Sequence, residues 1–157
     1  MSFRLMFRLL LLLALGCAAR AEEPQRGGVL TAIHWPEPTI LNSAINSGFA
    51  AAFISTKIFE GLVEYDREGK PVPALAERWT ISPDGLTITF HLRQGVKWHD
   101  GVDFTSDDVR FSLEVWRRYH SRGRLIYANV TAVETPDPHT IILRLSEPAP
   151  AMMSSLN

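Results

Sequence analysis

The chain has 157 residues, 46% of them hydrophobic and 21% charged, a composition typical of one globular domain rather than a disordered or fibrous chain. Its 16 basic and 17 acidic residues give a net charge of -1, so no positive field could hold a nucleic-acid backbone and nucleic acid is excluded as an expected partner. Ten glycines and ten prolines exclude a long coiled coil and favour several short elements.

The first residues have the pattern of an export signal. Two arginines precede an apolar run at residues 9–15, and Ala19-Arg20-Ala21 places small residues where a signal peptidase reads them. The run is shorter than the roughly 20 residues that span a bilayer, so an uncleaved membrane helix is the weaker alternative. We expect residues 1–21 to be a signal peptide. The mature chain, residues 22–157, then has 13 basic and 17 acidic residues.

The only cysteine, Cys17, lies inside this signal. The mature chain would therefore have no disulfide, no thiolate metal ligand and no cysteine nucleophile. Lipid attachment at Cys17 is an alternative, because the small residue Gly16 precedes it as in bacterial lipoprotein signals. Ala14 and Leu15 fit such a signal poorly, so cleavage after Ala21 is favoured over lipidation.

A strand and a helix are predicted at the start of the mature chain. Alternating residues predict a strand over residues 28–33, and the prolines of residues 34–38 end it. Phenylalanines and isoleucines recur at helical spacing across residues 48–62, alanines favour a helix there, and Gly61 lies near its end. We expect this helix to be well buried.

A β-hairpin is predicted next. Strands at residues 78–81 and 86–93 flank Ser82-Pro83-Asp84-Gly85, where proline presets one turn angle and glycine permits a positive one. Alternate residues of the second strand face the same side, namely Leu86, Ile88, Phe90 and Leu92. This side should pack in the core.

A helix and a second hairpin follow. Thr105 and Asp108 have the spacing of a capping box, so a helix is predicted to begin here and to end near Gly123. Residues 129–135 and 140–145 then form a second pair of strands around a proline-rich turn.

The predicted elements sum to a mixed α/β fold, an α+β-like sheet of locally paired strands with helices interspersed. The last residues, from Ser146 onward, predict a proline-bounded turn that leads into an apolar helix. We expect the chain to stop within that element.

No catalytic or metal centre is predicted. The five histidines are scattered and no thiolate completes a zinc site, so neither a metal nor a cofactor is expected. His99-Asp100 could form an oriented base, but adjacent turn residues usually point apart, and a polar turn is favoured. Asp107 and Asp108 could bind a divalent cation, but the helix dipole sufficiently explains acids in a first helical turn. Phosphate-loop and nucleophile-elbow motifs are absent from the sequence, and the chain is predicted not to be an enzyme.

One tryptophan differs from the others. Trp79 and Trp116 have strand or helix spacing and are expected in the core. Trp35 lies between His34 and Pro36 in an irregular loop after the first predicted strand, a place where loops often contact ligands. It is the strongest candidate for a ligand contact from the residues alone.

An ordered run of motifs occupies the centre of the chain. It consists of Ala74-Leu75-Ala76-Glu77-Arg78-Trp79, Ser82-Pro83-Asp84-Gly85, Thr89-Phe90-His91-Leu92-Arg93-Gln94-Gly95-Val96-Lys97-Trp98-His99-Asp100-Gly101 and Phe104-Thr105-Ser106-Asp107-Asp108-Val109. Glu37-Pro38-Thr39-Ile40-Leu41-Asn42 and Phe59-Glu60-Gly61-Leu62-Val63 precede it, and Asp137-Pro138-His139-Thr140 follows. The run resembles the signature of bacterial extracellular solute-binding proteins of family 5, the peptide and nickel receptors of ABC importers.

This resemblance implies a periplasmic-binding-protein-like type II fold, of which residues 22–157 would form the amino-terminal, incomplete part of lobe I. In the family, two hinged lobes close over an extended ligand, and an acidic residue that pairs with the amino terminus of a bound peptide lies in the second lobe. The resemblance implies that this sequence ends before the second lobe. The segment after the first strand contributes first-lobe ligand contacts, which implies Trp35, Glu37, Pro38 and Thr39 here.

The implied function is that of a periplasmic, monomeric, non-enzymatic receptor. It would bind an oligopeptide or dipeptide-like ligand and deliver it to an ABC permease in the inner membrane. Nickel chelates, haem, opines and sugars stay open as ligands. The alternative is a stand-alone exported interaction module or degenerate fragment without ligand capture, and an exported hydrolase that uses His99 and Asp100 is the weaker third interpretation.

Overall fold

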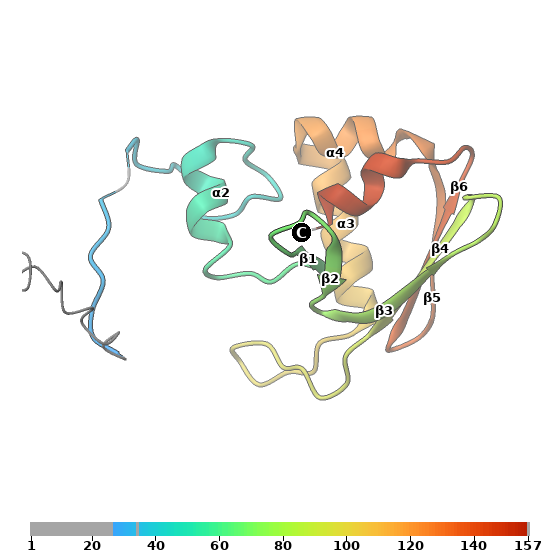
Figure 1. Cartoon of the computed structure of the whole chain (residues 1–157), viewed down its shortest axis with the longest axis horizontal. Helices are drawn as coiled ribbons and strands as arrows, with labels where there is room; N and C mark the ends of the chain where they lie inside the picture. Colours follow the sequence, from blue (N-terminus) through green and yellow to red (C-terminus); the bar gives the residue numbers. More distant parts are fainter. Residues whose placement is uncertain (1–26, 34, 157) are drawn as a thin grey trace, which may run out of the picture. The chain divides into compact units, whose positions relative to one another are not determined.

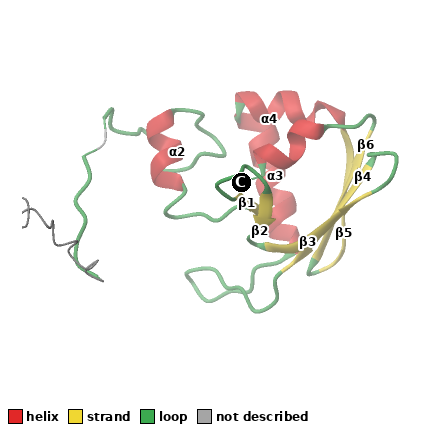
Figure 2. Cartoon of the chain, in the orientation of Figure 1, coloured by secondary structure: helices red, strands yellow, loops and turns green. Residues whose placement is uncertain are grey.

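A computed structural model describes residues 27–33 and 35–156. The predicted signal peptide at residues 1–21, with Cys17, lies outside the described residues. The elements in chain order are α2 (Phe49–Ser55), β1 (Val63–Tyr65), β2 (Pro71–Pro73), β3 (Ala76–Ile81), β4 (Thr87–Leu92), α3 (Ser106–Tyr119), α4 (Ser121–Ile126), η1 (Tyr127–Asn129), β5 (Val130–Asp137), β6 (Thr140–Leu145) and η2 (Pro150–Ser155) (Figures 1 and 2). Among the helices of these described ranges, none is long and apolar enough to cross a membrane.

A four-stranded antiparallel sheet in the order β3-β4-β6-β5 forms the centre of the unit that follows Ile33. Both predicted hairpins are confirmed, and β6 pairs with β4 to join them. Phe90 lies opposite Trp79 on one side and Ile141 on the other. Gly85 has a φ of 72° in the first turn, the conformation for which glycine was expected there.

The buried face of the sheet packs against α3. Ile88, Phe90 and Leu92 are buried from β4, as their alternation predicted, and Ile141 and Leu143 are buried from β6. The α3 helix contacts β5 and β6 and lies along the sheet in Figure 1. The fold is therefore the mixed α/β arrangement expected from the sequence.

The helix α3 begins as its capping box predicts. The Asp108 carboxylate accepts hydrogen bonds from the Thr105 backbone N–H at 2.8 Å and from the Thr105 hydroxyl at 3.0 Å. Val109 and Leu113 are buried on its inner face, and Trp116 packs against the core, as does Trp79. Both tryptophans thus pack against the core as expected, although each is only partly buried.

The last described residues close the core. Met152, in η2, is fully buried, and the backbone carbonyl of Leu156 accepts hydrogen bonds from the N–H groups of Leu62 and Val63 at 2.9 and 3.3 Å. Those two residues lead into the small β1–β2 hairpin. The predicted apolar helical turn exists, but as a 3-10 helix.

The prediction of a strand at residues 28–33 is wrong. This segment has no regular secondary structure, and Val29, Leu30 and Ile33 are almost fully exposed. A strand needs a hydrogen-bonded neighbour, and none of the described strands pairs with this segment. Residues 27–33 also belong to a different compact unit from residues 35–156.

The helix predicted over residues 48–62 is shorter and more exposed than expected. α2 ends at Ser55, because the N–H groups of Lys57 and Ile58 bond carbonyls only three residues back. Of its residues, only Ala50, Ala51 and Ser55 are buried, whereas Phe59, beyond its end, is 46% exposed. Helical spacing therefore placed the helix, but its burial prediction was wrong.

The helix predicted to end near Gly123 stops earlier, at Tyr119. His120 has extended backbone angles, and α4 begins directly after it, with the Gly123 N–H donating to His120 Nδ1 at 3.3 Å. A Cβ at Gly123 would lie 2.3 Å from the backbone oxygen of Trp116. This glycine therefore permits the close contact of α4 with the end of α3 and does not terminate a single helix.

Candidate functional site

The predicted ligand contacts lie together in one exposed loop that leads to α2. Trp35 is 87% exposed, Glu37 and Thr39 are exposed, and Pro38 is half-buried. The peptide bond between Trp35 and Pro36 is cis. Within the described residues the Glu37 carboxylate makes no ion pair or hydrogen bond. The loop thus presents an indole ring and a carboxylate to its surroundings.

Polar bonds determine the path of this loop. The Asn42 side chain accepts from the Ala44 N–H at 2.8 Å, and the Asn46 amide donates to the Thr39 hydroxyl at 3.3 Å. The buried Ser55 hydroxyl accepts from the backbone N–H of Ser43 at 3.1 Å and lies 3.0 Å from its hydroxyl. Because Ser55 is in the last turn of α2, these two bonds attach the loop to the helix.

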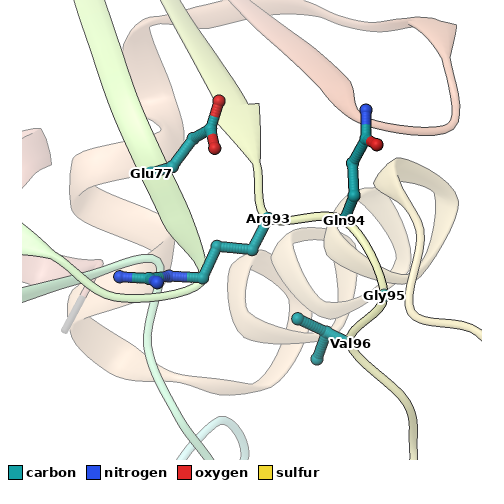
Figure 3. Close-up of a pocket in the computed structure, with 5 residues that line it drawn as sticks. All are labelled: Glu77, Arg93, Gln94, Gly95 and Val96. Atoms are coloured by element: carbon teal, nitrogen blue, oxygen red, sulfur yellow. The ribbon is translucent and has the colours of Figure 1, made fainter.

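A second candidate is a surface pocket where β3 begins and β4 ends. Glu77 lines it from β3, and Arg93, Gln94, Gly95 and Val96 line it from the segment after β4 (Figure 3). In Figure 3 the Arg93 side chain extends beneath Glu77, and Gln94 points away from Val96.

The charged groups of this pocket already have structural partners. Arg93 donates from Nε to the Ala74 carbonyl and from its backbone N–H to the Leu75 carbonyl at 2.9 Å. Glu77 pairs with Arg78 at 2.9 Å, and both side chains are about half exposed. Arg93 therefore ties the end of β4 to the segment before β3, and the pocket does not include the predicted loop residues.

The other residues considered for chemistry have local roles. Asp100 accepts the Val102 backbone N–H at 3.0 Å, which makes the His99-Asp100 segment a polar turn. Asp107 pairs with Arg110 at 3.1 Å, and Asp108 caps α3. Across residues 27–33 and 35–156 the structure shows no group of three histidine, cysteine, aspartate or glutamate residues that could hold a metal ion.

Sequence reasoning missed a group of arginines around the junction of α3 and α4. Arg117, Arg118 and Arg124 line one surface pocket together with Glu114 and Ala128. The signal was present in the sequence, because residues 115–133 contain four arginines and no acidic residue.

The chain is similar to substrate-binding components of ABC transporters. The family model described as bacterial extracellular solute-binding proteins, family 5 Middle, matches residues 70–157. A peptide-binding protein of an ABC transporter from Brucella ovis is 42% identical over 103 residues, which are 62% of this chain and 19% of the relative.

Solved structures give the same picture. AgaA from A. tumefaciens R10, in complex with agropinic acid, has a TM-score of 0.65 and 40% identity, covering 76% of this chain and 25% of that chain. Haemophilus influenzae OppA, in complex with RPPGFSPFR, has a TM-score of 0.67 and 28% identity, covering 76% of this chain and 27% of that chain.

Because the family model matches more than half of the residues, the chain belongs to the bacterial extracellular solute-binding proteins of family 5. The resemblance inferred from the central motifs is thereby confirmed. The chain spans about a fifth of the length of the curated relatives it matches.

Proposed function

We propose that this protein is the periplasmic substrate-binding component of an ABC importer, which binds peptides or similar small solutes and delivers them to a membrane permease. Membership of the solute-binding family carries the proposal. Relatives named for peptide binding favour a peptide-like ligand, whereas solved neighbours in complex with agropinic acid and with a peptide keep other small solutes within the proposal. Within this proposal residues 1–21 are an export signal and residues 22–157 belong to the first lobe.

The ligand contacts of this part of the receptor are Trp35, Glu37, Pro38 and Thr39. An indole ring that is 87% exposed can bury a large apolar area when a ligand covers it. The Glu37 carboxylate, without an ion pair in the described part of the chain, can accept a hydrogen bond from a ligand amide or ammonium group. Bonds from Ser43 and Asn46 constrain the loop, so less conformational entropy is lost on binding.

Calorimetry on the full-length receptor tests the proposal. The purified protein is titrated with a library of short peptides, and the tightest ligand is then measured with Trp35→Ala. We expect the substitution to weaken binding about tenfold, because tryptophan is enriched among the interface residues whose truncation costs more than about 1 kcal/mol.

Phe111→Ala is the matched control, because Phe111 is also a largely exposed aromatic residue but lies on α3. It should leave the affinity unchanged. Equal losses in both variants would contradict the assignment of the loop. Failure of every peptide to bind, together with failure to associate with a permease, would refute the receptor function and leave the interaction-module alternative.

A further inference from the structure

The arginines at the α3–α4 junction form a strongly charged surface, within the described residues, that the proposed function does not use. We name the set Arg117, Arg118, Arg122 and Arg124 the junction arginines. The charged residues of the segment 115–133 are these four arginines alone. The rest of residues 22–157 carries 9 basic and 17 acidic residues. Positive charge is therefore concentrated in one short segment of a chain that is otherwise acidic.

The junction arginines make no ion pair within residues 35–156, a property that they share with Lys57, Arg67 and Lys70 but not with four other surface cations. Arg78, Lys97, Arg110 and Arg144 each form an ion pair with a nearby carboxylate. Among the ion pairs of residues 35–156, none includes a junction arginine. Their guanidinium groups thus keep their hydrogen-bonding capacity for a group outside the described chain.

Helix dipoles explain only part of this arrangement. Arg117 and Arg118 lie in the last turn of α3, and Arg124 in the last turn of α4, where a cation is stabilised by the carbonyl end of the helix. Arg122 is the second residue of α4, at the positive end of that helix, where a cation is disfavoured.

The local electrostatic potential agrees with an accumulation of positive charge. His120 lies between the two helices, and its pKa is lowered first by burial and then by the positive charges of Arg122 and Arg124. Glu114 is the only acidic residue lining the pocket, against three arginines.

Aromatic neighbours hold two of the guanidinium groups in place. Arg117 lies over the ring of Tyr127 at 5.6 Å, and Arg118 lies over the ring of Tyr119 at 5.3 Å. A guanidinium group that stacks by its face leaves the N–H groups along its edge available for a planar oxyanion. Exposed Tyr119 and Leu125 lie beside the arginines in sequence and add apolar area, a composition typical of protein interfaces.

We propose that the junction arginines form a docking surface for an acidic segment of a partner protein, whose carboxylates bind the exposed guanidinium groups of Arg117, Arg118 and Arg124. Charge complementarity selects an acidic partner, and the exposed Tyr119 and Leu125 beside the arginines favour a protein segment over a layer of lipid phosphates. The surface involves none of the loop residues proposed to contact ligand, so this inference does not depend on the transported solute.

Fluorescence anisotropy of the full-length protein with a labelled peptide of alternating glutamate and glycine tests the surface. We expect salt-sensitive binding, weakened about tenfold in Arg117→Gln/Arg118→Gln because charge-assisted bidentate hydrogen bonds are lost. The variant Arg117→Lys/Arg118→Lys keeps the charge but not the planar fork, and it should bind severalfold more weakly than wild type. Binding of that lysine variant equal to wild type would overturn the proposed carboxylate geometry.

The control Arg78→Gln/Lys97→Gln removes the same charge from ion-paired positions. This control should change the affinity for the acidic peptide less than twofold. If it loses as much affinity as Arg117→Gln/Arg118→Gln, the binding depends only on net charge and the proposal is overturned. Absence of peptide binding by wild type would also overturn it.

Phosphatidylglycerol vesicles form the second arm of the experiment. If they bind the protein at least as strongly as the peptide does, and this binding depends on the arginines, the surface is assigned to lipid instead. Unchanged calorimetric titration of the transported solute in the junction variant separates this result from a failure of the proposed receptor function.

Discussion

Two regions of the molecule are stabilised by different interactions. The first is the four-stranded sheet with α3, and the second is the loop that leads to α2, together with α2. In the first region, backbone ladders join β3, β4, β6 and β5, and side chains such as Phe90 and Ile141 are fully buried. In the second, hydrogen bonds of Ser43 and Asn46 hold the loop, and Trp35 remains exposed. Burial of apolar area is the larger stabilising contribution, so the sheet should contribute more to the stability of the fold than the loop does.

The largest contrast between the two regions should appear when an aromatic side chain is truncated in each. Phe90→Ala is expected to lower the free energy of unfolding by about 3–5 kcal/mol, because it leaves a cavity in the centre of the sheet. Trp35→Ala should change it by about 0.5 kcal/mol or less, since its ring is exposed. Urea unfolding followed by circular dichroism measures both, and similar losses would abolish the distinction.

A substitution at Gly123 tests how tightly α4 packs against the end of α3. Gly123→Ala places a Cβ 2.3 Å from the Trp116 backbone oxygen, and we expect a loss of about 1–3 kcal/mol as α4 moves away from α3. The matched control is Ser121→Ala, an exposed substitution in the same helix. Thermal unfolding of the two variants gives the comparison. A stabilised Gly123→Ala would mean that α4 relaxes freely and that this contact is loose.

The sheet region could be predicted from sequence because its determinants are local. Alternation in β4, the turn at Ser82-Pro83-Asp84-Gly85 and the capping box of Thr105 each specify backbone geometry within a few residues. The break at His120 was missed, because it depends on the contact of Gly123 with Trp116 and not on a helix stop signal.

The loop region could be predicted less well because burial depends on distant parts of the chain. Residues 28–33 have the alternation of a strand, but alternation does not supply a pairing partner. Helical spacing placed α2 but could not say how much of it would be covered. Trp35 was identified from its place in an irregular loop, and Glu37, Pro38 and Thr39 through family resemblance; the exposure of Trp35, Glu37 and Thr39 agrees with a contact role that stays a prediction.

The anchor between Ser55 and Ser43 can be removed without touching the sheet. Ser55→Ala leaves the Ser43 N–H without its acceptor, and we expect a local loss of about 1–2 kcal/mol. Hydrogen exchange at residues 42–46 should accelerate, whereas exchange in β4 and β6 should stay unchanged. Thr56→Ala, at the exposed position directly after α2, is the control, because its hydroxyl donates only within the helix end, to the Phe53 carbonyl at 3.0 Å. Faster exchange across the sheet would show that the two regions unfold together.

The smallest expected effect concerns the exposed ion pair between Glu134 and Arg144 at 2.9 Å, which joins β5 to β6 on the solvent side of the sheet. The hydrogen bond from Arg144 is the main cause that holds the pKa of Glu134 below its ordinary value of 4.5. A carboxyl group with a lowered folded-state pKa stabilises the fold above its ordinary pKa, and this contribution disappears as pH falls through the folded-state value.

Melting temperatures of wild type and Glu134→Gln should therefore differ most near neutral pH and converge in acid, below the ordinary pKa. Glu64→Gln, an exposed substitution in β1 outside the four-stranded sheet, corrects for general charge effects. The difference at neutral pH should be small because both partners are nearly half exposed and solvent screens their attraction. A difference that stays constant as the solution is acidified would show that Glu134 acts through packing and not through its charge.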